Sequence, residues 1–213
     1  DHIQGLAADD LAAGNQANIH FAVFQGGEQA VFGDGADSLV TDGPDSILGQ
    51  RCGVTGVADT VGSHLQLSAD GQVVVSHDLY FHPRYSIRPD GSLVMRGDPR
   101  EWLYKMSYED IRKYDVGSRS CDVWPDKECF PAVKPLVSDL IDCVETYTSE
   151  NSLSPMRYNI EVKSKEGLGE GVDWADYKVL SDACMEVLLS KQLGDRLVVQ
   201  CFDVRAGLDT EIA

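Results

Sequence analysis

The residues best placed to do chemistry stand close together in the stretch YNIEVKSK, residues 158–165. In an extended strand successive side chains point to opposite faces, so Glu161 and Lys163 share one face while Ile160 and Val162 lie on the other. A carboxylate and an ammonium on one face can act on a single ligand, and catalytic groups of parallel α/β barrels lie at strand C-terminal ends. The spacing therefore predicts a ligand site here. The alternative is an ordinary ion pair on a solvated edge strand.

A second candidate for chemistry is His77, which ends the β-branched run QVVVS and is followed by Asp78. Residues 65–68 alternate as a strand does, and Ala-Asp-Gly at 69–71 is a tight-turn sequence, so the pattern predicts two strands joined by a turn. A lone histidine at a strand end is more often structural than catalytic. The adjacent carboxylate and the strand-terminal position favour proton transfer, because imidazole titrates near neutral pH.

The elements that must position these groups are predicted to alternate between helices and strands. Helical signals begin at Ser107 and end near Gly117, and further helices are expected over 138–147 and 174–193. A near-continuous apolar strand is expected over 197–203. Strands separated by helices indicate parallel β/α units, so we expect an α/β fold whose sheet is buried on both faces.

Composition narrows the classes of partner. The chain has 213 residues, enough for a sizeable core, and a formal net charge of -17. That charge argues against a nucleic-acid partner, since phosphate backbones are bound by clustered Lys and Arg. No stretch approaches the roughly 18 to 20 apolar residues of a membrane span. Residues 1–62 hold nine acidic residues and one basic residue, Arg51, so we expect an acidic, turn-rich segment followed by a separate unit over 63–213.

The six cysteines show no zinc-like spacing. Cys121 and Cys129 bracket a short loop, and we expect a disulfide there in an oxidising compartment. Cys143 and Cys184 fall in helical patterns and Cys201 in a strand pattern, where buried thiols that pack as small hydrophobes are expected.

Three motifs resemble the glycerophosphodiester phosphodiesterase family over about residues 59–205. The stretch LSADGQVVVSHD, residues 67–78, is similar to that family's strand, Asp-Gly turn, strand and His-Asp. The stretch NIEVK, residues 159–163, is similar to its Ile-Glu-Ile-Lys strand, and QCFD, residues 200–203, to its Gln-Ser-Phe strand. The resemblance implies a TIM-type (β/α) barrel, of which only about strands two to five are recognisable in this chain.

The resemblance also implies roles for individual residues. His77 would be one of two histidines that move protons to and from the attacking and leaving oxygens of a phosphodiester. Glu161 would ligate Ca²⁺ or Mg²⁺, hard ions suited to carboxylate oxygen, and Lys163 would hold a phosphate oxygen as a point charge. The implied reaction, part of lipid and glycerol metabolism, converts a glycerophosphodiester and water into glycerol 3-phosphate and an alcohol. The family's frequent export implies a periplasmic or secreted protein.

The chain departs from the family before residue 65. The His-Arg-Gly motif of the first strand is absent, and Gly62 and His64 stand where the family has its Glu-x-Asp metal pair. One carboxylate leaves little negative charge for a hard cation, so we expect weak Ca²⁺ or Mg²⁺ binding. The sequence therefore predicts a phosphodiester hydrolase with impaired activity. The alternative is a non-catalytic derivative or fragment that keeps Glu161 and Lys163 to bind a phosphorylated ligand.

Overall fold

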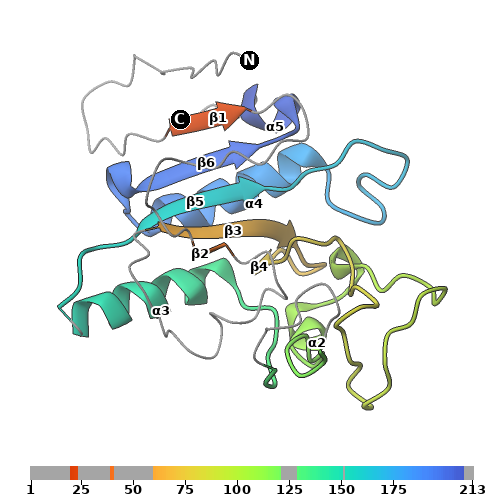
Figure 1. Cartoon of the computed structure of the whole chain (residues 1–213). Helices are drawn as coiled ribbons and strands as arrows, with labels where there is room; N and C mark the ends of the chain where they lie inside the picture. Colours follow the sequence, from red (N-terminus) through yellow and green to blue (C-terminus); the bar gives the residue numbers. More distant parts are fainter. Residues whose placement is uncertain (1–19, 24–38, 41–59, 121–128, 151, 209–213) are drawn as a thin grey trace.

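The computed structural model describes residues 20–23, 39–40, 60–120, 129–150 and 152–208, and side chains within 61–206 of these ranges. A mostly parallel sheet organises this part of the chain (Figure 1). Its strands follow one another across the sheet in the order β1, β6, β5, β3 and β2. The bounds are His20–Val23 for β1, Leu39–Val40 for β2, Thr60–Leu67 for β3, Arg157–Val162 for β5 and Leu197–Cys201 for β6.

The strand β4, Val73–Val75, is the antiparallel member and pairs with the end of β3. The turn between them is the predicted one, in which the Gly71 amide donates to the Ser68 carbonyl over 3.1 Å. Gly71 has a φ of 76°, a left-handed conformation that side chains with a Cβ rarely adopt. The hairpin therefore forms as the Asp-Gly turn predicts.

The alternation predicted for β5 is seen in β3, β5 and β6. Tyr158, Ile160 and Val162 are buried on the face that packs against the helices, as are the odd-numbered residues of β3 and β6. Glu161 lies on the opposite face. Because β5 pairs with β3 on one side and β6 on the other, it is a central strand, and the edge-strand alternative for Glu161 is wrong.

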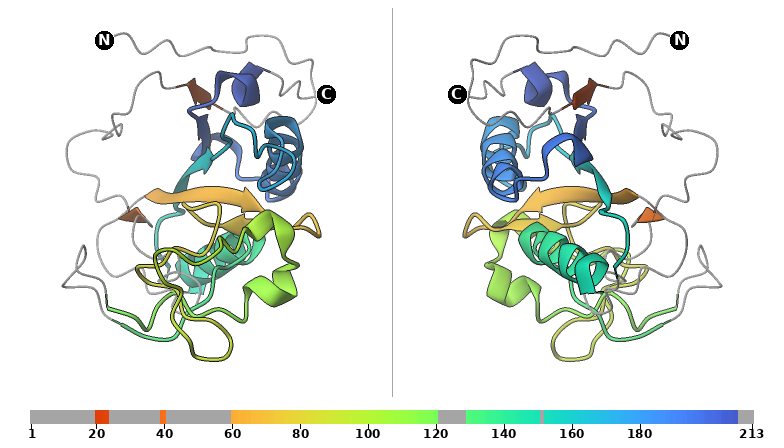
Figure 2. Two further views of the ribbon diagram at one scale, coloured as in Figure 1. Left: turned by 90° about the vertical axis from the view of Figure 1, so that its right-hand side faces the viewer. Right: turned by 90° about the vertical axis from the view of Figure 1, so that its left-hand side faces the viewer.

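Two long helices cover the apolar face of the sheet. These are α3, Val137–Glu150, and α4, Tyr177–Ser190, and their buried side chains join the strands in one hydrophobic cluster (Figures 1 and 2). The helix α4 starts where Asp176 accepts a hydrogen bond from the Lys178 amide over 2.9 Å, a side-chain N-cap. Both predicted helices therefore exist, α4 starting three residues later than expected.

A half-buried polar contact fixes α3 against the sheet. The Tyr158 hydroxyl donates to Glu145 over 2.6 Å, and Arg196 donates to both oxygens of the same carboxylate over 2.8 Å. Arg196 belongs to the short 3₁₀ helix η2, Gly194–Arg196, which leads into β6. A bidentate guanidinium–carboxylate pair is strong and directional, so it sets the position of α3 relative to β5 and β6.

The segment after β4 builds a second, smaller core. It contains the 3₁₀ helix η1, Leu103–Lys105, and the helix α2, Tyr108–Ile111, which Ser107 caps by accepting from the Asp110 amide. A separate hydrophobic cluster holds this segment together: Val74, Phe81, Tyr85, Val94, Leu103, Ile111, Tyr114 and Val116. The helix predicted over 107–117 is therefore real but shorter, since it ends at Ile111.

The predicted α/β class with a mostly parallel sheet is confirmed, and the described strands form an open sheet rather than a closed barrel. The expected division at residue 62 stays a prediction, although β3 already begins at Thr60 and β1 and β2 lie within 1–62. In the part of the chain that the structure describes, no helix is long and apolar enough to cross a membrane. The last element of the described residues is the helix α5, Val204–Leu208.

Some of the cysteine predictions are confirmed and others are wrong. Cys184 and Cys201 are buried thiols, as expected. Cys143 belongs to a disulfide, so its prediction as a thiol is wrong. Its position on α3 is only half-buried, which leaves the sulfur accessible to another part of the chain. Cys129 keeps its thiol, so the predicted bridge to Cys121, which lies outside the described residues, is also wrong.

Truncating the central strand tests this packing. Ile160→Ala removes a fully buried side chain between the sheet and its helices, so we expect the free energy of unfolding to fall by about 2–5 kcal/mol. Urea denaturation followed by circular dichroism measures it. The matched control is Val179→Ala on α4, where the side chain is 48% exposed, and a change within about 0.5 kcal/mol is expected. Equal losses in the two variants would contradict this assignment of the core.

Candidate functional site

A row of polar residues crosses the sheet near its C-terminal edge. In the register of the parallel strands His64 of β3 lies beside Glu161 of β5, and Glu161 lies beside Gln200 of β6. Glu161 and Gln200 are each the last residue but one of their strands. Parallel strands bring their C-terminal ends to one edge, which is where α/β proteins bind their ligands. Two of the three motifs found in the sequence therefore meet in this row.

Glu161 is the buried charge at the centre of the site, with 3% of its surface exposed. One carboxylate oxygen lies 3.1 Å from His64 Nε2 and the other 3.3 Å from Lys163 Nζ. Burial pushes the pKa of Glu161 upward, but the hydrogen bond from His64 and the charge of Lys163 outweigh it, so the pKa lies below its ordinary value. The carboxylate is therefore ionised near neutral pH.

Lys163 is fixed at the end of β5 by its backbone. Its carbonyl accepts a hydrogen bond from Gln66 Nε2 over 3.1 Å, and its amide donates to the Leu65 carbonyl over 3.4 Å. Its side chain is 28% exposed, so the ammonium reaches both the buried Glu161 and the solvent. A lysine held this way can offer its remaining N–H donors to an anionic ligand.

His77, which follows β4 of the antiparallel hairpin, lies beside His64 at the same edge of the sheet. Its ring meets that of His64 edge to face, with centroids 4.9 Å apart, and its side chain is 49% exposed. The register explains this, because the Ser76 amide donates to the His64 carbonyl over 2.8 Å, so the next residue lies over β3. The three predicted site residues His77, Glu161 and Lys163 are thus brought together, with His64 between them.

Asp78 orients His77. His77 Nδ1 lies 3.4 Å from one Asp78 oxygen, and the Tyr85 hydroxyl donates to the other over 2.6 Å. Burial raises the pKa of Asp78, but the hydrogen bonds from His77 and Tyr85 and the charge of Lys134 hold it well below its usual range. An ionised Asp78 favours the proton on Nδ1, which puts the imidazole lone pair on Nε2.

Lys134 supports this turn and was missed in the sequence. It is fully buried, and its Nζ donates to Ser76 Oγ over 2.8 Å, while Ser76 Oγ donates to the Asp78 carbonyl over 2.7 Å. A buried ammonium is costly unless polar groups solvate it, so this contact holds the turn from Ser76 to Asp78 against the segment that leads into α3. No local pattern marks this residue, because a lysine beside a proline reads as an exposed loop residue.

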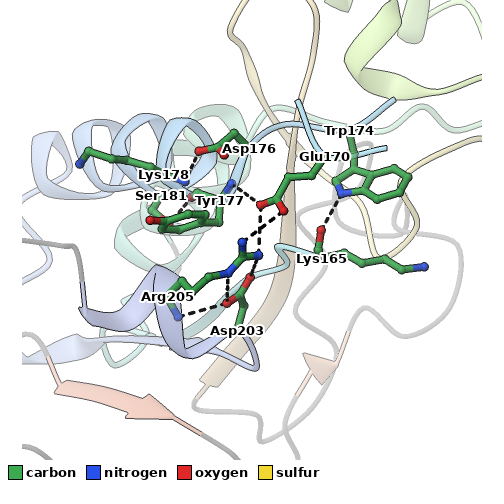
Figure 3. Close-up of polar contacts among 9 residues, drawn as sticks. All are labelled: Lys165, Glu170, Trp174, Asp176, Tyr177, Lys178, Ser181, Asp203 and Arg205. Atoms are coloured by element: carbon green, nitrogen blue, oxygen red, sulfur yellow. Dashed lines mark hydrogen bonds and ion pairs between the residues drawn. The ribbon is translucent and has the colours of Figure 1, made fainter. Parts of the chain in front are cut away.

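The loop that leaves β5 is pinned over the same edge of the sheet (Figure 3). Arg205 of α5 donates to both oxygens of Glu170, over 3.1 and 3.2 Å, and to Asp203 over 2.6 Å. This ties the β5 loop to the residues that follow β6. Charge-assisted hydrogen bonds therefore hold the β5 loop against α5.

Trp174 closes the same loop from within. Its indole Nε1 donates to the Lys165 carbonyl over 2.7 Å, as Figure 3 shows. Gly169 passes so close to the ring that a Cβ at this position would overlap it. A glycine is required there, because any side chain would push the indole away.

The residues of the site do not fit a hard divalent cation. Ca²⁺ takes six to eight oxygen ligands and Mg²⁺ an octahedral set. Glu161 is the carboxylate of the row, Gly62 brings no side chain, and His64 Nε2 already lies against Glu161. In the ranges that the structure describes, no group of three or more His, Cys, Asp or Glu could hold a metal ion. Weak binding of Ca²⁺ or Mg²⁺ stays a prediction.

Comparison with known proteins adds evidence from structure alone. No family model and no curated protein sequence matches this chain. A solved structure assigned as a glycerophosphoryl diester phosphodiesterase, from Silicibacter pomeroyi, matches with a TM-score of 0.58 at 17% identity, covering 70% of this chain and 49% of that one. A glycerophosphoryl diester phosphodiesterase domain from Mycobacterium tuberculosis matches with a TM-score of 0.49 at 13% identity, covering 79% and 53%. An Oleispira antarctica phosphodiesterase, solved with the product sn-glycerol-3-phosphate, matches with a TM-score of 0.47 at 24% identity. The match covers 76% of this chain and 53% of that one.

The match to the Silicibacter pomeroyi structure supports the assignment of the fold. The chain has an α/β fold with a mostly parallel sheet and a polar row at the C-terminal edge. Within that class it shares the fold of part of a glycerophosphodiester phosphodiesterase, which confirms at the level of structure the resemblance inferred from the three motifs. The chain spans about half the length of the structures that it matches.

Asp78→Asn tests the electrostatics of the turn. The pKa of this carboxyl is 3.8 when unperturbed and well below that in the folded protein. Its ionised form therefore contributes stability that is fully present above pH 3.8 and lost as pH falls through the folded pKa. We expect the variant to lose about 1–3 kcal/mol of unfolding free energy at pH 7, and less as the pH falls below 4. Urea denaturation across this pH range measures the difference.

The control for that experiment is Asp182→Asn on α4, an exposed carboxylate that pairs with Lys178. Removing it should change the unfolding free energy by about 0.5 kcal/mol or less. If Asp78→Asn shows the same loss at about pH 2 as at pH 7, charge at the turn is not what stabilises it.

Proposed function

We propose that this chain carries the phosphate-handling part of a phosphodiester hydrolase that acts on glycerophosphodiesters, and that its activity is impaired by the residues at positions 62 and 64. The observation that carries the proposal is the convergence of His77, Glu161 and Lys163 at the C-terminal edge of a sheet with this fold. A phosphoryl oxygen would accept from Lys163, which supplies a compact positive charge.

The geometry supports a defined role for His77 in the reaction. Asp78 leaves the lone pair on Nε2, so His77 can take the proton of an attacking water while the new P–O bond forms. The bond from phosphorus to the alcohol oxygen then breaks, and that oxygen takes up a proton. The products are glycerol 3-phosphate and the alcohol. The protonated His77 can supply that proton. The His64 ring, whose centroid lies 4.9 Å from that of His77, has its Nε2 against Glu161 and packs beside the proton-transfer group.

Glu161 acts in this scheme through its neighbours. Its carboxylate holds His64 on one side and Lys163 on the other, and the His64 ring packs against His77, so Glu161 helps to position His77 relative to the phosphate-binding charge. The same pairing explains the expected impairment. In this chain the buried carboxylate is already matched by an imidazole and an ammonium, and no other carboxylate lies in the row to draw a divalent cation.

A second candidate function rests on the pairing of Glu161 with His64 and Lys163. If Glu161 is fully occupied by His64 and Lys163, the site keeps a phosphate-binding charge without a complete catalytic set, and the chain binds a phosphorylated ligand such as glycerol 3-phosphate without turning over a diester. A periplasmic or extracellular location remains part of the proposal. The disulfide at Cys143 supports an oxidising compartment.

One substitution separates hydrolysis from binding. We expect His77→Ala to lower the release of glycerol 3-phosphate from glycerophosphocholine by about 10²- to 10⁴-fold, the usual contribution of a proton-transfer group, and to leave binding of glycerol 3-phosphate intact. An enzyme-coupled assay measures the release and calorimetry the binding. A wild-type rate equal to that of the His77→Ala variant would overturn the hydrolase and leave the binding function.

Lys163→Met tests the charge that both functions need. It should weaken glycerol 3-phosphate binding by about tenfold or more, which corresponds to about 1.4 kcal/mol. Lys178→Met is the matched control, since it removes a lysine that pairs with a carboxylate on the surface of α4. Calorimetry on both variants decides the matter, and equal affinities would rule out Lys163 as the phosphate-binding residue.

Restoring the missing carboxylates tests the cause of the impairment. The double variant Gly62→Glu with His64→Asp places three carboxylates around one point of the sheet, so Ca²⁺ affinity should rise by about tenfold or more. The matched control, Gly62→Gln with His64→Asn, has the same shape without the charge. Calcium titration calorimetry compares the two. Equal affinity in both would show that the two positions do not control metal binding.

A further inference from the structure

A cavity lies in the segment that follows β4, and it is formed by other residues than the phosphodiester site. It has a volume of about 670 Å³, within the range of small-molecule pockets. Its lining comes from two stretches of the 80–100 segment together with Arg119 and Ser120. It shares no lining residue with the site of His77, Glu161 and Lys163, so the two can be tested independently.

Positive charge distinguishes this cavity from the rest of a chain with a net charge of -17. Its lining includes Arg84, Arg96, Arg100 and Arg119. Within the described part of the chain, none of the four pairs with a carboxylate. Asp98 also lines the cavity, but its carboxylate accepts from Arg88, outside the lining, over 2.7 Å. The positive charges are therefore not neutralised by the cavity's own walls.

Two of the arginines are held in place before any ligand arrives. Arg119 Nη1 donates to the carbonyls of Pro83 and Val94 over 2.7 and 3.3 Å. The Arg100 guanidinium lies over the rings of Tyr80 and Trp102, at 4.7 and 5.2 Å from their centroids. Stacking holds a guanidinium flat and leaves its N–H edge for an acceptor.

The loop that carries Arg96 is also an ordered turn. Asp98 accepts from the Met95 amide over 3.0 Å, and the Asp98 amide donates back to the Met95 carbonyl over 3.2 Å. Gly97 has a φ of 105°, which favours glycine at this position. Arg96 thus stands at the tip of a defined turn at the cavity, so part of the ordering cost of binding is already met by the fold.

The pKa of His82, which also lines the cavity, responds to this positive charge. Partial burial and the positive charges of Arg84, Lys134 and Arg96 lower the pKa of His82, against the opposing charge of Asp78. His82 stacks between the rings of Tyr80 and Tyr85, at 6.3 and 5.4 Å. The cavity thus combines a positive field with a stacked aromatic wall.

We propose that this cavity is a second anion-binding site, which takes a small molecule that carries a phosphate group. Planar guanidinium groups match phosphate oxygens through paired hydrogen bonds. Four such charges around a cavity of this size suit a compact, multiply charged group, and the aromatic rings suit the organic part attached to it. The proposal does not depend on hydrolysis at Glu161, because none of the residues that form this site takes part in that reaction.

Inorganic pyrophosphate in the presence of a chelator is the probe, and calorimetry on the full chain is the measurement. Arg100→Gln removes the stacked guanidinium, so we expect pyrophosphate to bind at least about tenfold more weakly. Arg112→Gln is the matched control, because Arg112 is an exposed arginine outside the cavity whose nearest carboxylate partner is 3.8 Å away. Its affinity should equal that of the wild type.

The Lys163→Met variant separates the two sites. It should bind pyrophosphate as tightly as the wild type, because Lys163 belongs to the phosphodiester site and not to this cavity. Three results would overturn the proposal. These are absence of pyrophosphate binding at millimolar concentration, equal affinities for Arg100→Gln and Arg112→Gln, and loss of binding in Lys163→Met, which would place the anion beside Glu161. Failure of the hydrolase assay alone leaves the proposal intact.

Discussion

A carboxylate buried in the middle of a sheet must be matched by positive charge, and the arrangement around Glu161 follows from that requirement. The free-energy cost of burying an isolated charge is several kcal/mol or more, so His64 and Lys163 are drawn to its two oxygens. The position of β3 beside β5 supplies the first partner, and the strand's own period of two supplies the second. The site therefore depends on register as much as on residue type.

Much of this arrangement is predictable from the sequence because it is periodic. The alternation along residues 158–163 separates the core side of β5 from its polar side, and the structure has the same division. The Asp-Gly turn at 70–71 predicts the hairpin that ends in His77, and helical spacing predicts α3 and α4. In each case a few neighbouring residues determine a local conformation, and hydrophobic burial selects the face.

The contacts between distant segments are not predictable in this way. Nothing near Lys134 indicates that its ammonium is buried against Ser76, because the two residues meet only after the hairpin and α3 have packed. The pairing of His64 with Glu161 depends on which residues of β3 and β5 lie side by side. The disulfide at Cys143 depends likewise on tertiary position. Such contacts join residues far apart in the chain, and local patterns carry no information about them.

The short strand β4 has a further consequence for how this protein can change. Val73 and Val75 pack into the large core, whereas Val74 between them packs into the smaller core of the 81–116 segment. The three residues of β4 thus form a seam that contacts both hydrophobic units, and Tyr104 of η1 also packs against the larger one. Substitutions in separate packing units have effects that add rather than interfere. Substitutions in the turn that carries Arg96, which lies outside that seam, can therefore change a ligand preference with little effect on the sheet that holds Glu161. Tyr85 is a position where a change would reach both units, because its hydroxyl donates to Asp78.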